Sequence, residues 1–123
     1  MTGMHRSGTS AVAGVLGALG FQTPDPDDRM DWPESNPEHW ESMSLTVFDD
    51  ELLDRLGGSW DAPPDLPDGW VRDLDMSREP DPTGIVARAF PEPGPLVWKD
   101  PRICLLYPYW RQLLPEPAAV VFV

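Results

Sequence analysis

The first ten residues of the chain combine glycine, hydroxyl and cationic side chains in an order that suits anion binding. Gly3 and Gly8 enclose four residues, and the hydroxyl side chains of Thr9 and Ser10 follow where an apolar helical segment begins. Glycines let the backbone turn its N–H groups toward a phosphate, and a helix N-terminus adds a favourable dipole. The spacing predicts a phosphate-cradling loop over residues 2–10.

The cation of this loop is an arginine inside it. In the loop that binds nucleotide triphosphates, a lysine directly follows the second glycine. Here Thr9 takes that position, and the charge is supplied by Arg6, with Ser7 beside it. We therefore expect a loop that binds an anion other than the β- and γ-phosphates of ATP.

A second cation, Lys99, follows a short apolar segment at residues 96–98 that we predict to be a buried strand. In open parallel sheets, ligands bind beyond the carboxyl ends of the strands. Lys99 and Arg6 are therefore predicted to converge on one group. The alternative is an ordinary surface lysine beside Asp100, which would cap the next helix. We expect Arg102 to be a solvated helix residue or a partner for Asp100.

A general base must reach the proton of the acceptor, and several side chains are candidates. These are Glu41, Glu34, His39 and His5. Among 21 acidic residues, any single glutamate is more often at the surface than catalytic. His5, His39 and Cys104 show no metal-ligand spacing, so no metal site is expected. Cys104 stands between apolar residues, which predicts a buried packing role.

Composition limits the remaining functions. The chain has 123 residues, which suits a single domain over residues 1–123, and its formal net charge is −12. This charge argues against nucleic acid and anionic membranes as partners. One cysteine and the lack of an apolar run of about 20 residues favour a soluble, cytoplasmic protein. The oligomeric state is open.

Two helices are predicted in the first half of the chain. The first begins near Ser7 to Thr9 and ends near Leu19, with Gly20 at its C′ position. Its predicted apolar face consists of Val12, Val15, Leu16 and Leu19. Ser42 or Ser44 is expected to cap the second helix, which continues to about residue 56. Its predicted buried stripe consists of Leu45, Phe48, Leu52 and Leu56.

The second half of the sequence predicts helices and strands in alternation. A weaker helical pattern covers residues 85–90. Asp100 and Pro101 are typical of a helix start, and Pro108 should kink or divide that helix. Residues 118–123 read as a central parallel strand. These elements predict a partial three-layer α/β/α fold with a parallel sheet, P-loop-like and truncated at both ends. The strand that should feed the opening loop would be largely missing.

Three blocks of this sequence resemble the sulfotransferases that use PAPS (3′-phosphoadenosine 5′-phosphosulfate). Residues 2–10 resemble the family's 5′-phosphosulfate loop. Residues 36–41 resemble an N-P-x-G-Y-W-E block, with His39 where glycine is usual and Trp40 where tyrosine is usual. Residues 98–102 resemble the block in which Lys-Asp-Pro-Arg opens a helix. With the segments between them, the likeness spans nearly the whole chain.

The resemblance implies a role for each matching residue. Arg6 would contact the sulfuryl group and the bridging oxygen, Lys99 would neutralise charge at the sulfuryl group, and Glu41 would be the base on the acceptor hydroxyl. The 5′-phosphate of PAPS would be held by the loop residues Gly3, Ser7, Gly8, Thr9 and Ser10. The acceptor would be a hydroxyl of a small molecule or glycan, with lipid and tyrosine also open, and no metal would be needed.

One expected part of the donor site is missing from this sequence. In the family, an arginine and a serine that hold the 3′-phosphate follow the strand that here ends at Val123. We therefore expect the chain alone to bind PAPS weakly or not at all. The alternatives are a P-loop nucleotide-binding or kinase-like protein, and a degenerate module that binds partners without catalysis.

Overall fold

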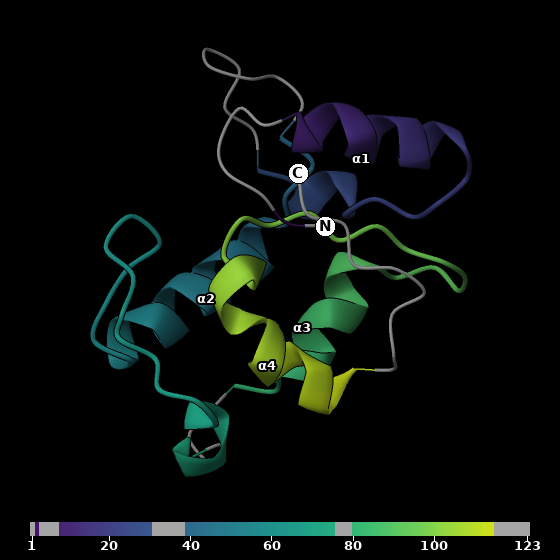
Figure 1. Cartoon of the computed structure of the whole chain (residues 1–123). Coiled ribbons are helices and arrows are strands. Elements are labelled where there is room, and N and C mark those ends of the chain that lie inside the picture. The colour runs from purple at the N-terminus through teal and green to yellow at the C-terminus, as the bar shows by residue number, and fades with distance from the viewer. Residues whose placement is uncertain (1, 3–7, 31–38, 76–79, 115–123) are drawn as a thin grey trace.

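The computed structural model describes residue 2 and residues 8–30, 39–75 and 80–114 (Figure 1). Figure 1 shows three of the α-helices, α2, α3 and α4, gathered in one body, and α1 lying along another side. The elements in chain order are α1 (Thr9–Ala18), the 3₁₀ helix η1 (Pro26–Asp28), α2 (Met43–Arg55), the 3₁₀ helix η2 (Trp70–Asp73), α3 (Pro82–Ala89) and α4 (Ile103–Leu113). None of the helices in these ranges has the length and apolarity needed to cross a bilayer.

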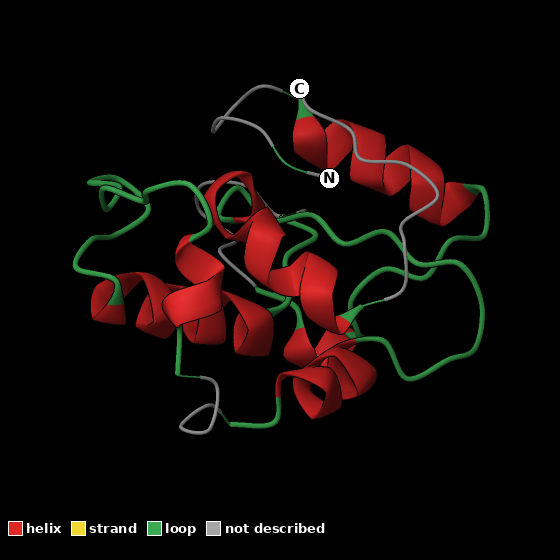
Figure 2. Cartoon of the chain, turned by 60° about the horizontal axis from the view of Figure 1, so that its bottom comes forward, coloured by secondary structure: helices red, strands yellow, loops and turns green. Residues whose placement is uncertain are grey.

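The predicted parallel sheet is wrong for this structure. The described residues form helices, turns and loops, with no strand among them (Figure 2), so the α/β/α fold class does not hold. Where a strand was predicted at residues 96–98, Gln22 and Leu96 form an isolated parallel bridge. The backbone N–H of Gln22 donates to Pro95 O at 2.9 Å, and that of Val97 donates to Gln22 O at 2.8 Å.

Proline explains why this bridge does not extend. Residues 91, 93, 95 and 101 are all proline, and a proline has no N–H to donate to a ladder. The apolar segment between them can therefore pair over a very short length. The strand predicted at residues 118–123 lies outside the described residues.

Helix α1 has the expected extent, but its predicted apolar face is wrong at Val15 and Leu19, whereas Val12 and Leu16 are partly buried. Gly20 follows it with φ +95°, as the C′ position requires. Val15 and Leu19 are 59% and 72% exposed, whereas Ala13 is fully buried. The reason is close packing through glycine: a Cβ on Gly14 would lie 3.5 Å from the Trp40 indole. The helix approaches its neighbours through small residues and turns Val15 outward, with Leu19 exposed directly after it.

Helix α2 confirms the prediction from periodicity. Its N-cap is Ser42, whose Oγ accepts a hydrogen bond from the N–H of Leu45 at 3.1 Å. Leu45, Phe48 and Leu52 are buried, as predicted. Leu56 follows the helix and is partly buried against the same cluster. Hydrophobic spacing and one capping serine were sufficient to locate this element.

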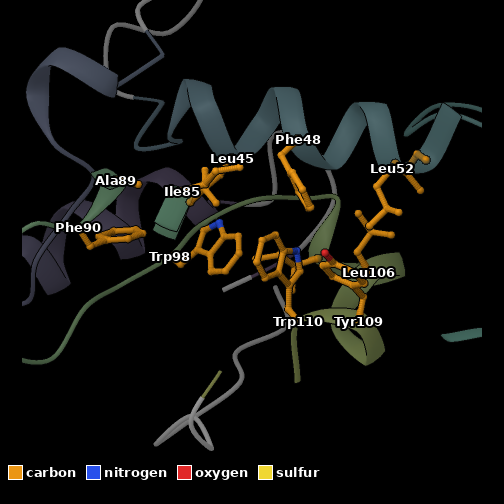
Figure 3. Packing of buried hydrophobic residues seen from close by; sticks show 12 residues of the cluster. Leu45, Phe48, Leu52, Ile85, Ala89, Phe90, Trp98, Leu106, Tyr109 and Trp110 are labelled. Carbon is orange, nitrogen blue, oxygen red and sulfur yellow. The ribbon is translucent and has the colours of Figure 1, made fainter. Parts of the chain in front are cut away.

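The hydrophobic core lies between α2, α3 and α4. Figure 3 shows Phe48 pointing from α2 toward Trp98 and Trp110. The Trp98 and Trp110 rings meet edge-on with centroids 4.7 Å apart, and Phe48 lies 5.3 Å from Trp110. Edge-to-face contacts of this kind add to the stabilisation from burial. Helix α3 confirms the weaker helical pattern, and its Ile85 and Ala89 complete this core.

Helix α4 excludes one of the two effects predicted for Pro108 and contradicts the prediction for Cys104. Pro108 does not divide the helix, which runs without a break from Ile103 to Leu113. Cys104 is exposed rather than buried. Asp100 acts at the turn that enters the helix, where its Oδ1 accepts from the N–H of Arg102 at 2.8 Å. The helix begins at Ile103, two residues after Pro101, which was predicted to be its first residue.

Candidate functional site

Glu41 and Lys99 form a buried ion pair. They are 58 residues apart in the chain, and Lys99 Nζ donates to Glu41 Oε1. The Glu41 side chain is 4% exposed and the Lys99 side chain is 8% exposed. Lys99 is therefore not the surface lysine that the sequence left open as an alternative. The structure brings together two of the three side chains predicted to be catalytic.

Local structure on the Glu41 side fixes the direction of this carboxylate. The N–H of Met30 donates to Glu41 O at 2.9 Å, and Arg29 forms an antiparallel bridge with Ser42. Trp40 has φ +56°, a left-handed conformation that is costly for a residue with a side chain. The Arg29 guanidinium lies 4.5 Å above the Trp40 ring. These contacts hold Trp40 in its turn and direct the next residue, Glu41, into the interior.

On the Lys99 side, Asp100 and Arg102 form a second ionic cluster with Asp50 of α2. The guanidinium of Arg102 binds both Asp50 oxygens, Nε at 2.5 Å and Nη2 at 3.0 Å. Its Nη1 donates to Asp100 Oδ1 at 3.2 Å. The predicted Arg102–Asp100 contact is present, and the solvated alternative is wrong because Arg102 is buried. Burial raises the pKa of Asp100, and Arg102 opposes part of that rise.

Asp49 is a buried carboxyl group that the sequence reasoning missed. Its Oδ1 accepts from Trp110 Nε1 at 2.9 Å, and the residue is fully buried. Burial, and then the nearby charge of Asp100, raise the pKa of Asp49 well above its ordinary value. A signal was present: Asp49 lies at helical spacing between the buried positions Leu45 and Leu52. A carboxylate within an apolar stripe predicts a buried polar contact.

The opening loop is described in part. Gly3, Arg6 and Ser7 lie outside the described residues, as do the base candidates His5 and Glu34. Gly8 is the N-cap of α1 with φ +91°, Thr9 is buried, and Ser10 lies in the first turn.

Two contacts connect the start of the chain to the site. Thr2 Oγ1 donates to Pro101 O at 3.2 Å, two residues after Lys99. Gly14 of α1 packs against Trp40, the residue before Glu41. The first block therefore contacts the third through Thr2 and Pro101, and the helix that follows the first block contacts the second through Gly14 and Trp40.

The other base candidate in the described ranges, His39, precedes Trp40 and is half-buried. Within the described part of the chain, no cluster of three or more His, Cys, Asp or Glu residues is arranged to hold a metal ion. Comparisons of the chain with protein-family models, with curated proteins and with solved structures found no match. The arrangement that could do chemistry is thus a buried carboxylate facing a buried ammonium group.

Proposed function

We propose that this protein is a sulfotransferase-like enzyme that transfers a sulfuryl group from PAPS to a hydroxyl acceptor. The observation that carries the proposal is the contact between Glu41 and Lys99. One is a candidate base, the other a candidate cation for the sulfuryl group, and they come from separate sequence blocks. The proposal rests on this site and on the resemblance of its blocks, and not on a sheet.

The transfer needs positioning and charge stabilisation more than covalent catalysis. Glu41 would accept the proton of the acceptor hydroxyl while the oxygen of that hydroxyl forms a bond to sulfur. The bond from sulfur to the bridging oxygen would break, and its electron pair would remain on the phosphate that leaves. Lys99 would offset the negative charge that develops around the sulfuryl group. Both side chains are buried, which strengthens such interactions by excluding water.

The opening loop would bind the other part of the donor. Arg6 would contact the sulfuryl group and the bridging oxygen, and Gly3 and residues 7–10 would hold the 5′-phosphate. The acceptor would be a small-molecule or glycan hydroxyl. A net charge of −12 and a single cysteine support a cytoplasmic protein that does not bind nucleic acid. We propose no metal for this chemistry.

Transfer of radiolabelled sulfate from PAPS to a panel of hydroxyl acceptors tests the proposal. We expect transfer by the wild-type protein and a loss of about 100-fold or more in Glu41→Gln, because general-base catalysis contributes on that order. Asp54→Asn is the matched control, since it removes one exposed carboxylate from α2 and should leave transfer unchanged. Transfer at the wild-type rate by Glu41→Gln would exclude Glu41 as the base.

One observation favours a second candidate, a module that binds partners without catalysis. Glu41 and Lys99 neutralise each other and are both buried, as in an ion pair whose role is structural. If the folded wild-type protein transfers label to no acceptor in the panel, this second function is the better one.

A further inference from the structure

Helix α1 is apolar all round after its first residues, but it is buried on one side and open on the other. After Ser10, every residue of α1 is alanine, valine, glycine or leucine. The inward side packs through Gly14 against Trp40 and through Gly17 against Thr23. The outward side is exposed, and α1 lies away from the body formed by α2, α3 and α4 (Figure 1). A helix that is hydrophobic all round is normally buried all round.

The outward side of α1 presents an apolar face centred on Val15. Val15 is 59% exposed, and Leu19 and Phe21 after it are 72% and 36% exposed. Ala11 and Ala18 are exposed too, and helical spacing places Ala11, Ala18 and Leu19 around Val15. We call these five residues the α1 face. Contiguous exposed apolar residues of this kind mark a contact with another molecule.

The distribution of charge indicates which molecule fits the α1 face. The chain has a formal net charge of −12, but residues 7–24 include no charged residue. An acidic or basic partner would therefore gain no opposite charge from this segment. A second copy of the chain would meet no like charge in it, whereas two copies that approach through acidic surfaces repel each other. An uncharged apolar face on a strongly acidic chain thus suits contact with its own copy.

We propose that two copies of this chain associate through the α1 face. Packed helices place the large side chains of one helix into the spaces beside small side chains of the other. The α1 face supplies both, since Val15 and Leu19 lie next to Ala11 and Ala18. In a two-fold symmetric contact the same face serves both copies, with its central residue, Val15, near the axis. Because α1 has only 10 residues, the contact is small and the dimer should be weak.

Sedimentation equilibrium on the full chain, at protein concentrations up to the millimolar range, measures the association. Wild type should pass from monomer to dimer as its concentration rises. Val15→Asp should weaken the dimer by about tenfold or more, as changes at the centre of an interface do. Val47→Asp is the matched control, because it places the same charge on a 48% exposed valine of α2 and should associate as wild type does. Added salt should strengthen the dimer, since it screens the repulsion between two acidic chains.

Intermolecular disulfide formation locates the contact. Cys104 is the only cysteine, so Cys104→Ser gives a background in which Val15→Cys or Val47→Cys introduces a single thiol. On oxidation, the Val15→Cys protein should form covalent dimers in much higher yield than the Val47→Cys protein. This comparison keeps the position of the contact testable if Val15→Asp fails to fold.

The outcomes decide between this contact and others. Wild type that remains monomeric at millimolar concentration in high salt overturns the proposal. A dimer that Val15→Asp and Val47→Asp weaken equally overturns it too, as do equal disulfide yields at the two positions. A dimer that salt dissociates contradicts it as well, because such a dimer is held by opposite charges. Association through the α1 face does not depend on sulfuryl transfer, so either result leaves the proposed function to its own assay.

Discussion

Removing one partner of the Glu41–Lys99 pair should destabilise the protein much more than removing both. The side chains are 4% and 8% exposed, which places the pair among buried rather than surface ion pairs. Lys99→Met leaves an unpaired carboxylate in the interior, and Glu41→Leu leaves an unpaired ammonium. Each change should lower the free energy of unfolding by about 3–5 kcal/mol. The double variant replaces both charges by apolar groups of similar size and should be within about 1 kcal/mol of wild type, or more stable.

Equilibrium urea denaturation followed by tryptophan fluorescence measures this cycle, because the chain has six tryptophans and two of them, Trp98 and Trp110, lie in the core. Arg88→Met is the control, since it removes an exposed cation from α3 and should change stability by no more than about 0.5 kcal/mol. Exposed ion pairs contribute about 0.2–1 kcal/mol. If each single variant lowers the free energy of unfolding by an amount in that range, and the two losses add in the double variant, the two side chains do not depend on each other as a buried pair should.

Two further predictions concern stability away from this pair. Burial raises the pKa of Asp49 in the folded state, so the folded protein holds a proton that the unfolded chain releases from about pH 4 upward. Stability should therefore fall as pH rises from about 4 toward the folded-state pKa, and Asp49→Asn should remove that part of the slope in urea titrations across pH. Gly14→Ala should stabilise the protein by up to about 1 kcal/mol, because the added Cβ makes an ordinary contact at 3.5 Å. Gly17→Ala should not, since its Cβ would lie 2.9 Å from the Thr23 methyl group; equal thermal midpoints for the two variants would contradict this.

The helices could be predicted from the sequence because their signals are local. The stripe from Leu45 to Leu52 and the Ser42 cap are contained within α2 itself, and the pattern at residues 85–90 became α3. The sheet could not be predicted in the same way, because a ladder needs donors on two segments. Proline on both sides of residues 96–98 limits those donors.

The orientation of α1 shows how packing overrides hydrophobic spacing. Its sequence places Val15 and Leu19 on a regular apolar face, but these side chains are exposed. The helix instead packs through Gly14 and Gly17, whose missing side chains allow Trp40 and Thr23 to come close. Periodicity gives the location of a helix, whereas the buried face depends on shape.

The candidate site was predictable in part. Lys99 was singled out by its place after a predicted strand, and Glu41 by the resemblance to sulfotransferases; the structure places the two in contact. Their spacing of 58 residues carries no such information. Arg102 was expected to be solvated or paired with Asp100, and its bond to Asp50 depends on how α2 and α4 pack. Arg6 stays a prediction, because it lies outside the described residues.

The most direct test of the proposed function uses the fact that Lys99 is the only lysine in the sequence. Protein labelled with ¹⁵N-lysine should give one side-chain ammonium signal, whose chemical shift reports the partner of Nζ. We predict that PAPS shifts this signal in a saturable way, that Mg²⁺-ATP at the same concentration does not, and that Glu41→Gln displaces the signal of the ligand-free protein. A signal that PAPS leaves unchanged up to millimolar concentration, or that Mg²⁺-ATP shifts instead, would contradict the assignment of Lys99 to a sulfuryl-donor site.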